Sequence, residues 1–435
     1  MTRFWLLAIA CDVWVSHFLN IMAKNKYITG QPIICQLLSL IPRDLFDQVV
    51  AEKGSDRYYK TMTTFKQFVF LFYGVVMRCR SLKNVCKNLL LLENKLSYLG
   101  ITQLPAVSTL SDANINRSSE VFACLYGKLY EYYKDKLSPF PCSFEDKLDI
   151  KKVFCFDSTT ITLFVDIFKG AGRNSINGKK KGGLKLHTKM PMSGFVPDLI
   201  HISEAACNDK TFLGQLNVEN GCIYIFDKGY VNYPVWEEWT RQGVFYLTRL
   251  NENASYQLIG GQVNHSVDYA NGGIISDQRI LLNDTLEARL IVFKDHVNGK
   301  VLKFISNMFD YHDTTIIQLY KYRWNIEVLF KQLKQNFELS YFFSDSSEGI
   351  KTQIWIALIA QLIFSVIHRQ IKENEAFVTL VNVASNNMGS YISLVRIMKV
   401  SQLNAQERNL DIVQLEIFGQ KQGGVFQNHE KSPWF

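Results

Sequence analysis

The chain has 435 residues, of which 47% are hydrophobic and 20% charged, a composition that excludes a largely disordered protein. This length is sufficient for two or three domains with a large buried core. The formal net charge of +8 favours an anionic partner but does not identify one.

The cysteines give no sign of a disulfide framework or a metal site. All nine are scattered along the chain, with no CxxC pair and no Cys/His cluster at zinc spacing. This pattern predicts reduced thiols in a cytosolic protein and no structural metal.

The first 21 residues differ in character from the rest of the chain. Their apolar run, residues 4–10, is interrupted by Asp12 and is too short for a membrane span or a convincing signal peptide. Met22 then opens a polar segment that is more typical of a natural N-terminus. We therefore expect residues 1–21 to be a non-native or disordered extension produced by a misplaced start codon, and we expect no membrane partner.

Residues 22–145 are predicted to form an α-helical N-terminal domain that binds DNA. Apolar side chains recur at helical spacing in five segments of this region. The segment Asp56-Arg57-Tyr58-Tyr59-Lys60 combines basic and aromatic residues that are suited to DNA, although a structural role is the favoured interpretation. The five predicted helical segments are residues 34–40, 43–52, 65–79, 82–92 and 119–134, the first two being separated by Ile41-Pro42.

The pattern changes near residue 151 to short β-rich runs that alternate with helical ones. Such alternation predicts an α/β core with some parallel strand pairing, assigned here to residues 146–250 and 310–372. Between the two parts, residues 251–309 form a β-rich insertion, and residues 373–435 form a C-terminal helical region and tail. The predicted core strands are residues 152–156, 161–165, 183–190, 196–203, 222–226 and 244–250.

A basic cluster occupies a Gly-rich segment of the core. Lys179, Lys180 and Lys181 lie close in sequence to Arg173 and Lys185. A phosphate-contacting loop and a merely solvated loop explain this pattern equally well.

Two aspartates each follow a hydrophobic strand. Asp157 comes after the predicted strand 152–156, and Asp227 after the predicted strand 222–226. Ligand-binding residues gather at strand ends of α/β sheets. Taken singly, however, an aspartate in this position is more often a turn former or a helix cap.

A third carboxylate lies on a predicted helix, residues 313–337. Tyr320, Arg323, Glu327 and Lys334 have the spacing Y-x2-R-x3-E-x6-K, which at about 100° per residue sets them on one stripe together with Lys331. A carboxylate among cations suits a metal ion beside a polyanion. The competing interpretation is a solvated helix face with pairs such as Glu327 and Lys331.

The three carboxylates together make the metal interpretation much stronger. Asp157, Asp227 and Glu327 suffice to hold two Mg²⁺ or Mn²⁺ ions about 3.5–4 Å apart, an arrangement that catalyses in-line phosphodiester displacement. With metal ions activating the nucleophile, such a site needs no Ser, Cys or His nucleophile.

The order DST…DKGY…YKYRWNIEVLFKQLK resembles the DDE transposases of the insertion-sequence-4 family, whose hallmark is the Y-x2-R-x3-E-x6-K signature. The runs GGLKLHTKM, SDQRI and KTQIWIALIAQL are also similar, and the resemblance spans about residues 31–372. It implies a ribonuclease H-like catalytic core in which Asp157, Asp227 and Glu327 are the catalytic metal ligands. It further implies DNA contacts by Tyr320, Arg323 and Lys334, with Lys331 and Trp324 as secondary contacts.

The same resemblance implies an activity and its partners. Similar enzymes cleave double-stranded DNA at the inverted repeats that end the transposon, then join the 3′ hydroxyl to target DNA, as homodimers assembled on DNA in the bacterial cytoplasm and nucleoid. The alternatives are a nuclease of the same fold without strand transfer, and an inactive regulator bound at DNA ends.

Two features depart from the family pattern, and two residues have alternative interpretations. Residues 251–309 contain no tryptophan to stack an extruded base, so a hairpin pathway is in question. Lys228 stands where an arginine is commoner in the family. His187 either approaches the metals or, as favoured, is a structural strand residue, and Trp324 either stacks on DNA or packs against the insertion.

Overall fold

The computed structural model describes most of the chain between residues 30 and 400. The predicted extension at residues 1–21, the lysines at 179–181 with Arg173, and the tail beyond residue 400 lie outside the described residues. The seven cysteines within them are free thiols, as expected. The described ranges are 30–137, 144–163, 182–194, 196–214, 216–262, 273–295, 299–337, 339–371 and 375–400.

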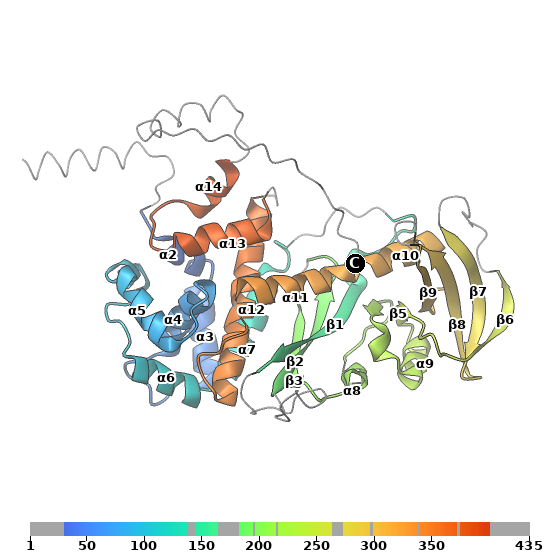
Figure 1. Cartoon of the computed structure of the whole chain (residues 1–435), viewed down its shortest axis with the longest axis horizontal. Coiled ribbons are helices and arrows are strands. Elements are labelled where there is room, and N and C mark those ends of the chain that lie inside the picture. The colour runs from blue at the N-terminus through green and yellow to red at the C-terminus, as the bar shows by residue number, and fades with distance from the viewer. Residues whose placement is uncertain are drawn as a thin grey trace, which may run out of the picture.

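A helical body occupies one end of the molecule (Figure 1). Helices from both ends of the described chain form it, so segments far apart in sequence lie side by side there. Its N-terminal elements are α2 (Ile33–Leu38), α3 (Arg43–Lys53), α4 (Thr64–Val76), α5 (Leu82–Leu89), α6 (Val107–Asn116) and α7 (Glu120–Tyr133), with short 3₁₀ turns at Leu90–Leu92 and Lys95–Leu99. Its C-terminal elements are α12 (Ser347–Gln370), α13 (Phe377–Asn386) and α14 (Leu394–Val400).

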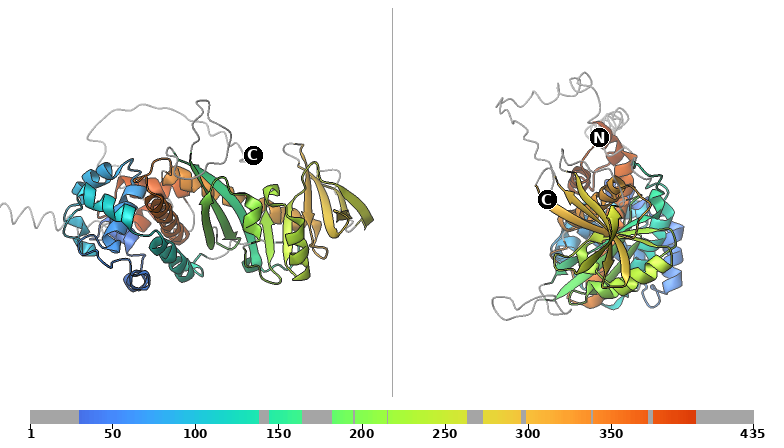
Figure 2. Two further views of the ribbon diagram at one scale, coloured as in Figure 1. Left: turned by 90° about the horizontal axis from the view of Figure 1, so that it is seen from below. Right: turned by 90° about the vertical axis from the view of Figure 1, so that its right-hand side faces the viewer.

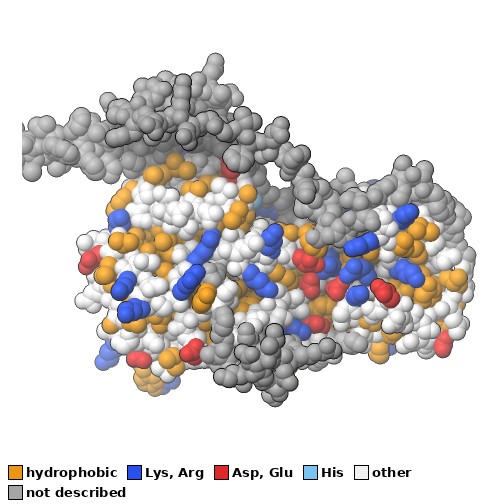
Figure 3. Space-filling view, in the orientation of Figure 1, with side chains coloured by type: hydrophobic (Ala, Val, Ile, Leu, Met, Phe, Trp, Pro, Cys, Tyr) orange, Lys and Arg blue, Asp and Glu red, His pale blue; other side chains and the backbone are white. Residues whose placement is uncertain are grey.

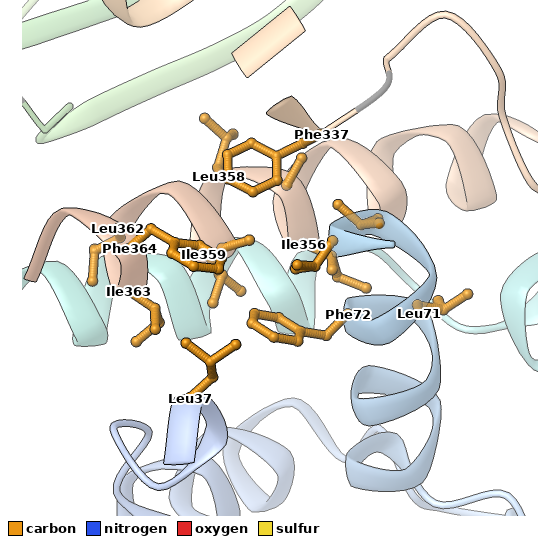
Figure 4. Close-up of a cluster of buried hydrophobic side chains, with 14 of the residues drawn as sticks. Leu37, Leu71, Phe72, Phe337, Ile356, Leu358, Ile359, Leu362, Ile363 and Phe364 are labelled. Carbon is orange, nitrogen blue, oxygen red and sulfur yellow. The ribbon is translucent and has the colours of Figure 1, made fainter. Parts of the chain in front are cut away.

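Helix α12 is the centre of this body. The Ser346 hydroxyl caps its first turn by accepting a hydrogen bond from Gly349 N at 3.0 Å. Figure 4 shows its Ile356, Ile359 and Ile363 among side chains of α2 and α4. Helix α12 is also long and apolar enough to cross a membrane, yet 83% of its most apolar window is buried inside the protein. Helix α12 is apolar around its whole circumference because other elements of the protein pack against all its sides.

The rest of the described chain is built on one nine-stranded sheet (Figures 1 and 2). Strand β1 pairs antiparallel with β2 and parallel with β4, which pairs parallel with β5. The predicted insertion extends the same sheet, because β9 pairs antiparallel with β5. In spatial order the strands are β3 (Leu199–Glu204), β2 (Gly183–Pro191), β1 (Val153–Thr162), β4 (Ile223–Phe226), β5 (Phe245–Arg249), β9 (Val301–Ser306), β8 (Leu286–Lys294), β7 (Ile274–Leu282) and β6 (Tyr256–Gln262).

Side chains alternate cleanly between the two faces of this sheet. Val153 and Cys155 of β1 join the apolar cluster beneath α10 (Asp313–Tyr322), whereas Phe156 joins the cluster beneath α9 (Tyr233–Arg241). Cys155 is directly paired with Ile225 of β4. Because the period of a strand is two residues, Asp157 and Asp227 both lie on the α10 face.

Two predicted elements differ from the structure around the candidate site. Asp157 does not end its strand, since β1 continues to Thr162 through its pairing with β2; only the pairing with β4 stops at Phe156. The predicted helix 313–337 is two helices, α10 and α11 (Trp324–Asn336). Arg323 lies at the break, where Arg323 N bonds to Tyr320 O three residues back in place of the α-helical partner four back.

A fully buried ion pair joins the insertion to the start of α10. Arg289 of β8 makes two hydrogen bonds to Asp277 of β7, of 2.9 and 2.6 Å, and both side chains are 0% exposed. The same guanidinium donates to the carbonyls of Met308 and Tyr311, just before α10 begins. This arginine therefore fixes the segment that aims α10 and α11 across the sheet.

We expect Asp277→Asn to destabilise the protein by about 3–5 kcal/mol, because it leaves the Arg289 charge buried without its partner. Urea unfolding followed by tryptophan fluorescence measures the change in the free energy of unfolding. The matched control is Glu287→Gln, which breaks the exposed pair with Arg279 on the same two strands and should cost less than about 1 kcal/mol. Equal losses in both variants would contradict the role given to Arg289.

Candidate active site

The structure brings the three predicted carboxylates together on one face of the sheet. Asp157 comes from β1, Asp227 directly follows β4, and Glu327 lies in the first turn of α11, which crosses β1. The charges of Asp227 and Glu327 both act on Asp157. In the orientation of Figure 1, acidic and basic side chains gather beside one another in the middle of the molecule (Figure 3).

Two arginines pair with these carboxylates. The Arg323 guanidinium donates to Asp157 Oδ2 at 2.9 Å and to Glu327 Oε1 at 2.7 Å, so it bridges the sheet and α11. Arg249, the last residue of β5, donates to Asp227 Oδ1 at 2.9 Å. Arg323 was expected to contact DNA, and Arg249 was not foreseen. The position of Arg249 near the end of the predicted strand 244–250 is the sequence signal that could have identified this arginine.

Burial and these arginines set the charge of the site. Burial raises the pKa of Asp157 to about 6, although the Arg323 charge and the Ser158 N–H both oppose the rise. Burial also tends to raise the pKa of Asp227, but the hydrogen bond from Arg249 and the charge of Arg323 outweigh it and leave the pKa below its usual value. The two aspartates are thus unequal, with a proton held more readily on Asp157.

The donor set fits divalent magnesium or manganese in its chemistry. It consists of carboxylate oxygens alone, the hard ligands that these ions prefer. Three carboxylates facing two arginines leave one negative charge in excess. As the side chains stand, however, no three Asp, Glu, His or Cys residues of the described ranges surround a common point closely enough to hold a metal. The Arg323 guanidinium lies where a cation shared by Asp157 and Glu327 would bind.

The predicted DNA contacts occupy different environments. Tyr320 is only 9% exposed: its ring packs on Phe304, with a centroid separation of 4.9 Å, and lies 5.9 Å from the Arg249 guanidinium. Burial raises its pKa. Trp324 is 43% exposed at the start of α11, and Lys331 is exposed on the same helix. The Trp324 side chain is thus not buried against the insertion, and its DNA-stacking role stays a prediction.

Lys334 faces a hollow of about 320 Å³ between α11 and the end of β1. Partial burial lowers its pKa, and within the described residues it forms no ion pair. Hydroxyl groups of Thr160, Thr162 and Ser340 also line the hollow. A solvent-exposed lysine that lacks a carboxylate partner and lies beside three hydroxyl-bearing residues suits an anion such as a phosphate group.

A hydrogen-bonded cluster around Asp209, which the sequence did not reveal, supports Asp157 through Ser158, the next residue of β1. Ser158 N donates to Asp157 Oδ1 at 2.8 Å, and Ser158 Oγ donates to Asp209 Oδ1 at 2.9 Å. Lys185 lies 3.2 Å from the same Asp209 oxygen. Asp209 begins the short helix α8 (Asp209–Leu213), and nothing in its local sequence distinguishes it from an ordinary helix-start aspartate.

His187 belongs to this supporting cluster. Its Nε2 lies 3.0 Å from Ser203 Oγ, its Nδ1 3.6 Å from Asp209, and its ring stacks on Phe212 at a centroid distance of 4.8 Å. The side chain is 2% exposed. These contacts agree with the favoured interpretation of His187 as a structural residue.

The burial of His187 predicts a pH dependence of stability. Burial lowers its pKa to about 4, the Asp209 charge opposing and the Lys185 and His201 charges reinforcing the shift, so below pH 6.5 the unfolded chain takes up a proton that the folded protein refuses. The stability that neutral His187 contributes is lost as the pH falls from about 6.5 towards 4. By pH 5 the loss amounts to about 2 kcal/mol.

We therefore expect His187→Gln to lose less stability than the parent protein between pH 7.5 and pH 5 in urea titrations. His312→Gln, which removes an exposed histidine outside this cluster, is the control. Parallel losses in the parent protein and His187→Gln would show that His187 is protonated in the folded state.

Two stretches of the chain match known protein families. Residues 149–363 match the family described as a transposase DDE domain, and residues 29–102 match a domain of unknown function. The first match contains both aspartates, Glu327 and both arginines of the site. A DDE domain was the motif-based expectation, and this match confirms it.

Relatives of the chain carry transposase names. One from Sinorhizobium fredii is 26% identical over 61% of this chain and 72% of its own length. A second, from Synechocystis sp. and named for the insertion sequence element IS4SA, is 25% identical over 71% of this chain and 83% of its own. A third, from Geobacillus stearothermophilus and named for IS5377, is 22% identical over 55% and 60%.

A solved structure also aligns with the chain. The piggyBac transposase synaptic complex with hairpin DNA covers 95% of this chain and 90% of that chain, at 11% identity and a TM-score of 0.43. This level of likeness is too low to assign a shared fold.

Proposed function

We propose that this chain, which carries a transposase DDE domain at residues 149–363, is a DNA transposase that cleaves the ends of an insertion sequence and joins the freed 3′ hydroxyl to target DNA. The observation that carries the proposal is the meeting of Asp157, Asp227 and Glu327 on one sheet face, beside Arg323 and the hollow of Lys334. Insertion-sequence relatives support the same activity. The Y-x2-R-x3-E-x6-K spacing and the name of the Synechocystis relative favour the insertion-sequence-4 family.

A ribonuclease H-like core is the fold proposed for the catalytic part. The strand order β3-β2-β1-β4-β5, with three antiparallel strands followed by two parallel ones, supports it. The insertion extends this core on its β5 side through β9. In this proposal residues 146–250 and 310–372 form the core, and the helical N-terminal region up to residue 145 binds DNA.

Two Mg²⁺ or Mn²⁺ ions held by Asp157, Asp227 and Glu327 would activate the attacking oxygen and stabilise the leaving oxygen. The side chains of this chain prepare the site for them. Arg249 keeps Asp227 ionised through its hydrogen bond, and the Ser158 N–H, steadied by Asp209, orients Asp157. Asp157 must lose its proton before it can bind a cation, so activity is expected to fall below about pH 6.

Arg323 has two duties in this proposal. Without DNA, it neutralises Asp157 and Glu327 and occupies the position of a shared cation. A DNA phosphate is a bidentate partner for a guanidinium, so a bound DNA end can draw Arg323 away from the carboxylates. The carboxylates are then free for metal ions, while Arg323, Lys334 and Lys331 bind the cut end. Tyr320 would act from beneath, by packing against Phe304 and holding Arg249 and Arg323 in place.

Partners and location follow from the activity. The proposed substrates are double-stranded DNA carrying the inverted repeats of the element and a target duplex, bound by a homodimer that assembles on the DNA. The excess of basic residues and the bacterial relatives support work in the cytoplasm on the nucleoid. A nuclease without strand transfer and an end-binding regulator remain the competing functions.

We expect Asp157→Asn, Asp227→Asn and Glu327→Gln each to lower DNA cleavage at least about a thousandfold while leaving DNA binding within a few-fold. The assay uses labelled duplexes copied from the genomic sequence on either side of the reading frame, with Mg²⁺, Mn²⁺ or chelator added. Glu238→Gln, on the opposite face of the sheet, is the control. Cleavage that survives Glu327→Gln would disprove the catalytic assignment.

Strand transfer separates a transposase from a nuclease. A pre-cut end with a free 3′ hydroxyl is incubated with a supercoiled target plasmid, and the joined product is measured. We expect joining by the parent protein and none by the three triad variants. Cutting without joining would favour the nuclease.

The double duty of Arg323 predicts opposite effects on its two ligands. Arg323→Gln should bind Mn²⁺ about tenfold more tightly than the parent protein when DNA is absent, because a competing cation has been removed, and should bind DNA ends more weakly. Electron paramagnetic resonance of free Mn²⁺ and fluorescence anisotropy measure these effects. Arg241→Gln on α9 is the control. Weaker Mn²⁺ binding by Arg323→Gln would refute the competition.

A further inference from the structure

The turn between α3 and α4 presents a tyrosine in a strained and exposed position. Tyr58 has φ of 76° and is 86% exposed. A left-handed backbone is unfavourable for a bulky residue, and glycine or asparagine normally occupies such a position. Because the Tyr58 ring is exposed, its packing offsets little of this strain.

Its neighbours hold the turn from inside. Asp56 accepts hydrogen bonds from the Thr64 N–H at 2.6 Å and the Thr64 hydroxyl at 2.7 Å. Arg117, which is 2% exposed, donates to Ser55 O and Met62 O, and its guanidinium lies 4.1 Å from the ring centroid of Tyr59. Asp56 and Tyr59 therefore have structural roles, which is the interpretation that the sequence favoured for residues 56–60. Tyr58 and Arg57 differ, because their described contact is with each other, 5.2 Å from guanidinium to ring centroid.

A hollow of about 280 Å³ adjoins this turn. Lys53, Arg57, Ser118 and Asn116 contribute cationic and hydrogen-bonding groups to its lining, and Glu120 contributes the one carboxylate. Within the described residues, neither Lys53 nor Arg57 forms an ion pair. Two cations that form no ion pair, beside neutral donors and a single carboxylate, favour an anionic ligand.

We propose that the Arg57–Tyr58 turn and its hollow form a second DNA contact, separate from the carboxylate site, that binds the duplex backbone. Arg57, Lys53 and the polar groups of the hollow contact phosphates, and the rigidly presented Tyr58 ring packs on the sugars. This inference rests on the proposed function, since it assumes that DNA is the substrate. Phosphate contacts of this kind give affinity and orientation without reading sequence.

The backbone strain at Tyr58 makes the test selective. A structural role predicts that Tyr58→Gly and Tyr58→Asn lower the thermal unfolding midpoint. A role in DNA binding predicts that both keep or raise the midpoint, because they relieve the left-handed strain, and that both weaken DNA binding. Tyr98→Ala, which removes another exposed tyrosine, and Lys83→Gln on α5 are matched controls.

Binding is measured on the full chain by fluorescence anisotropy at several KCl concentrations, with the genomic flank duplex and a random-sequence duplex. We expect Tyr58→Asn and Arg57→Gln to weaken binding about three- to tenfold on both duplexes. Arg57→Gln should also lower the slope of log affinity against log salt by about 1. Unchanged affinity and slope in both variants would overturn the proposal and leave the surface to a protein partner.

Cleavage separates this inference from the proposed function. At saturating protein concentration Tyr58→Asn should cleave the flank duplex as fast as the parent protein, whereas Asp157→Asn should bind but not cleave. If the parent protein does not cleave, the proposed function fails and the turn is still judged by binding. If Tyr58→Asn binds normally, the turn proposal fails alone.

Discussion

The parallel pairing of β1 with β4 is the constraint on which the proposed active site depends. Its register pairs Cys155 with Ile225, and the two-residue period of both strands then carries Asp157 and Asp227 to the same face. Helix α11 crosses that face and adds Glu327. A slip of one residue in this pairing would turn one aspartate into the apolar cluster beneath α9 and dismantle the site.

Charge balance is the second constraint. Three carboxylates this close repel one another, and in the folded chain Arg323 and Arg249 offset most of that repulsion. The arginines make the site stable without DNA, but Arg323 does so from the position that a shared cation would occupy. A substrate that binds arginine more strongly than carboxylates do would therefore prepare the site as it binds. Arg323 therefore affects both the stability of the site and its proposed activity.

The two ends of the molecule support the centre in different ways. The buried Arg289–Asp277 pair fixes the chain just before α10, and α12 packs the described C-terminal helices among the N-terminal ones. The helical body and the sheet thereby share one apolar cluster, which includes residues of β1, β2 and α11 as well as the helices. The helical body is consequently packed against the sheet that carries Asp157.

The sequence alone determined which residues are candidates for the chemistry: strand patterns indicated Asp157 and Asp227, and helical spacing indicated Glu327 with its cations. Together with the family resemblance they predicted a DDE domain, which the match of residues 149–363 supports. Local patterns also located most helices and strands. Only the tertiary structure decided that Arg323 bridges Asp157 and Glu327, that Arg249 and Asp209 join the site, that Tyr320 is buried, and that the insertion extends the core sheet. The physical reason is that periodicity reports which face of its own element a residue occupies. Ion pairs and burial depend on which distant element covers that face.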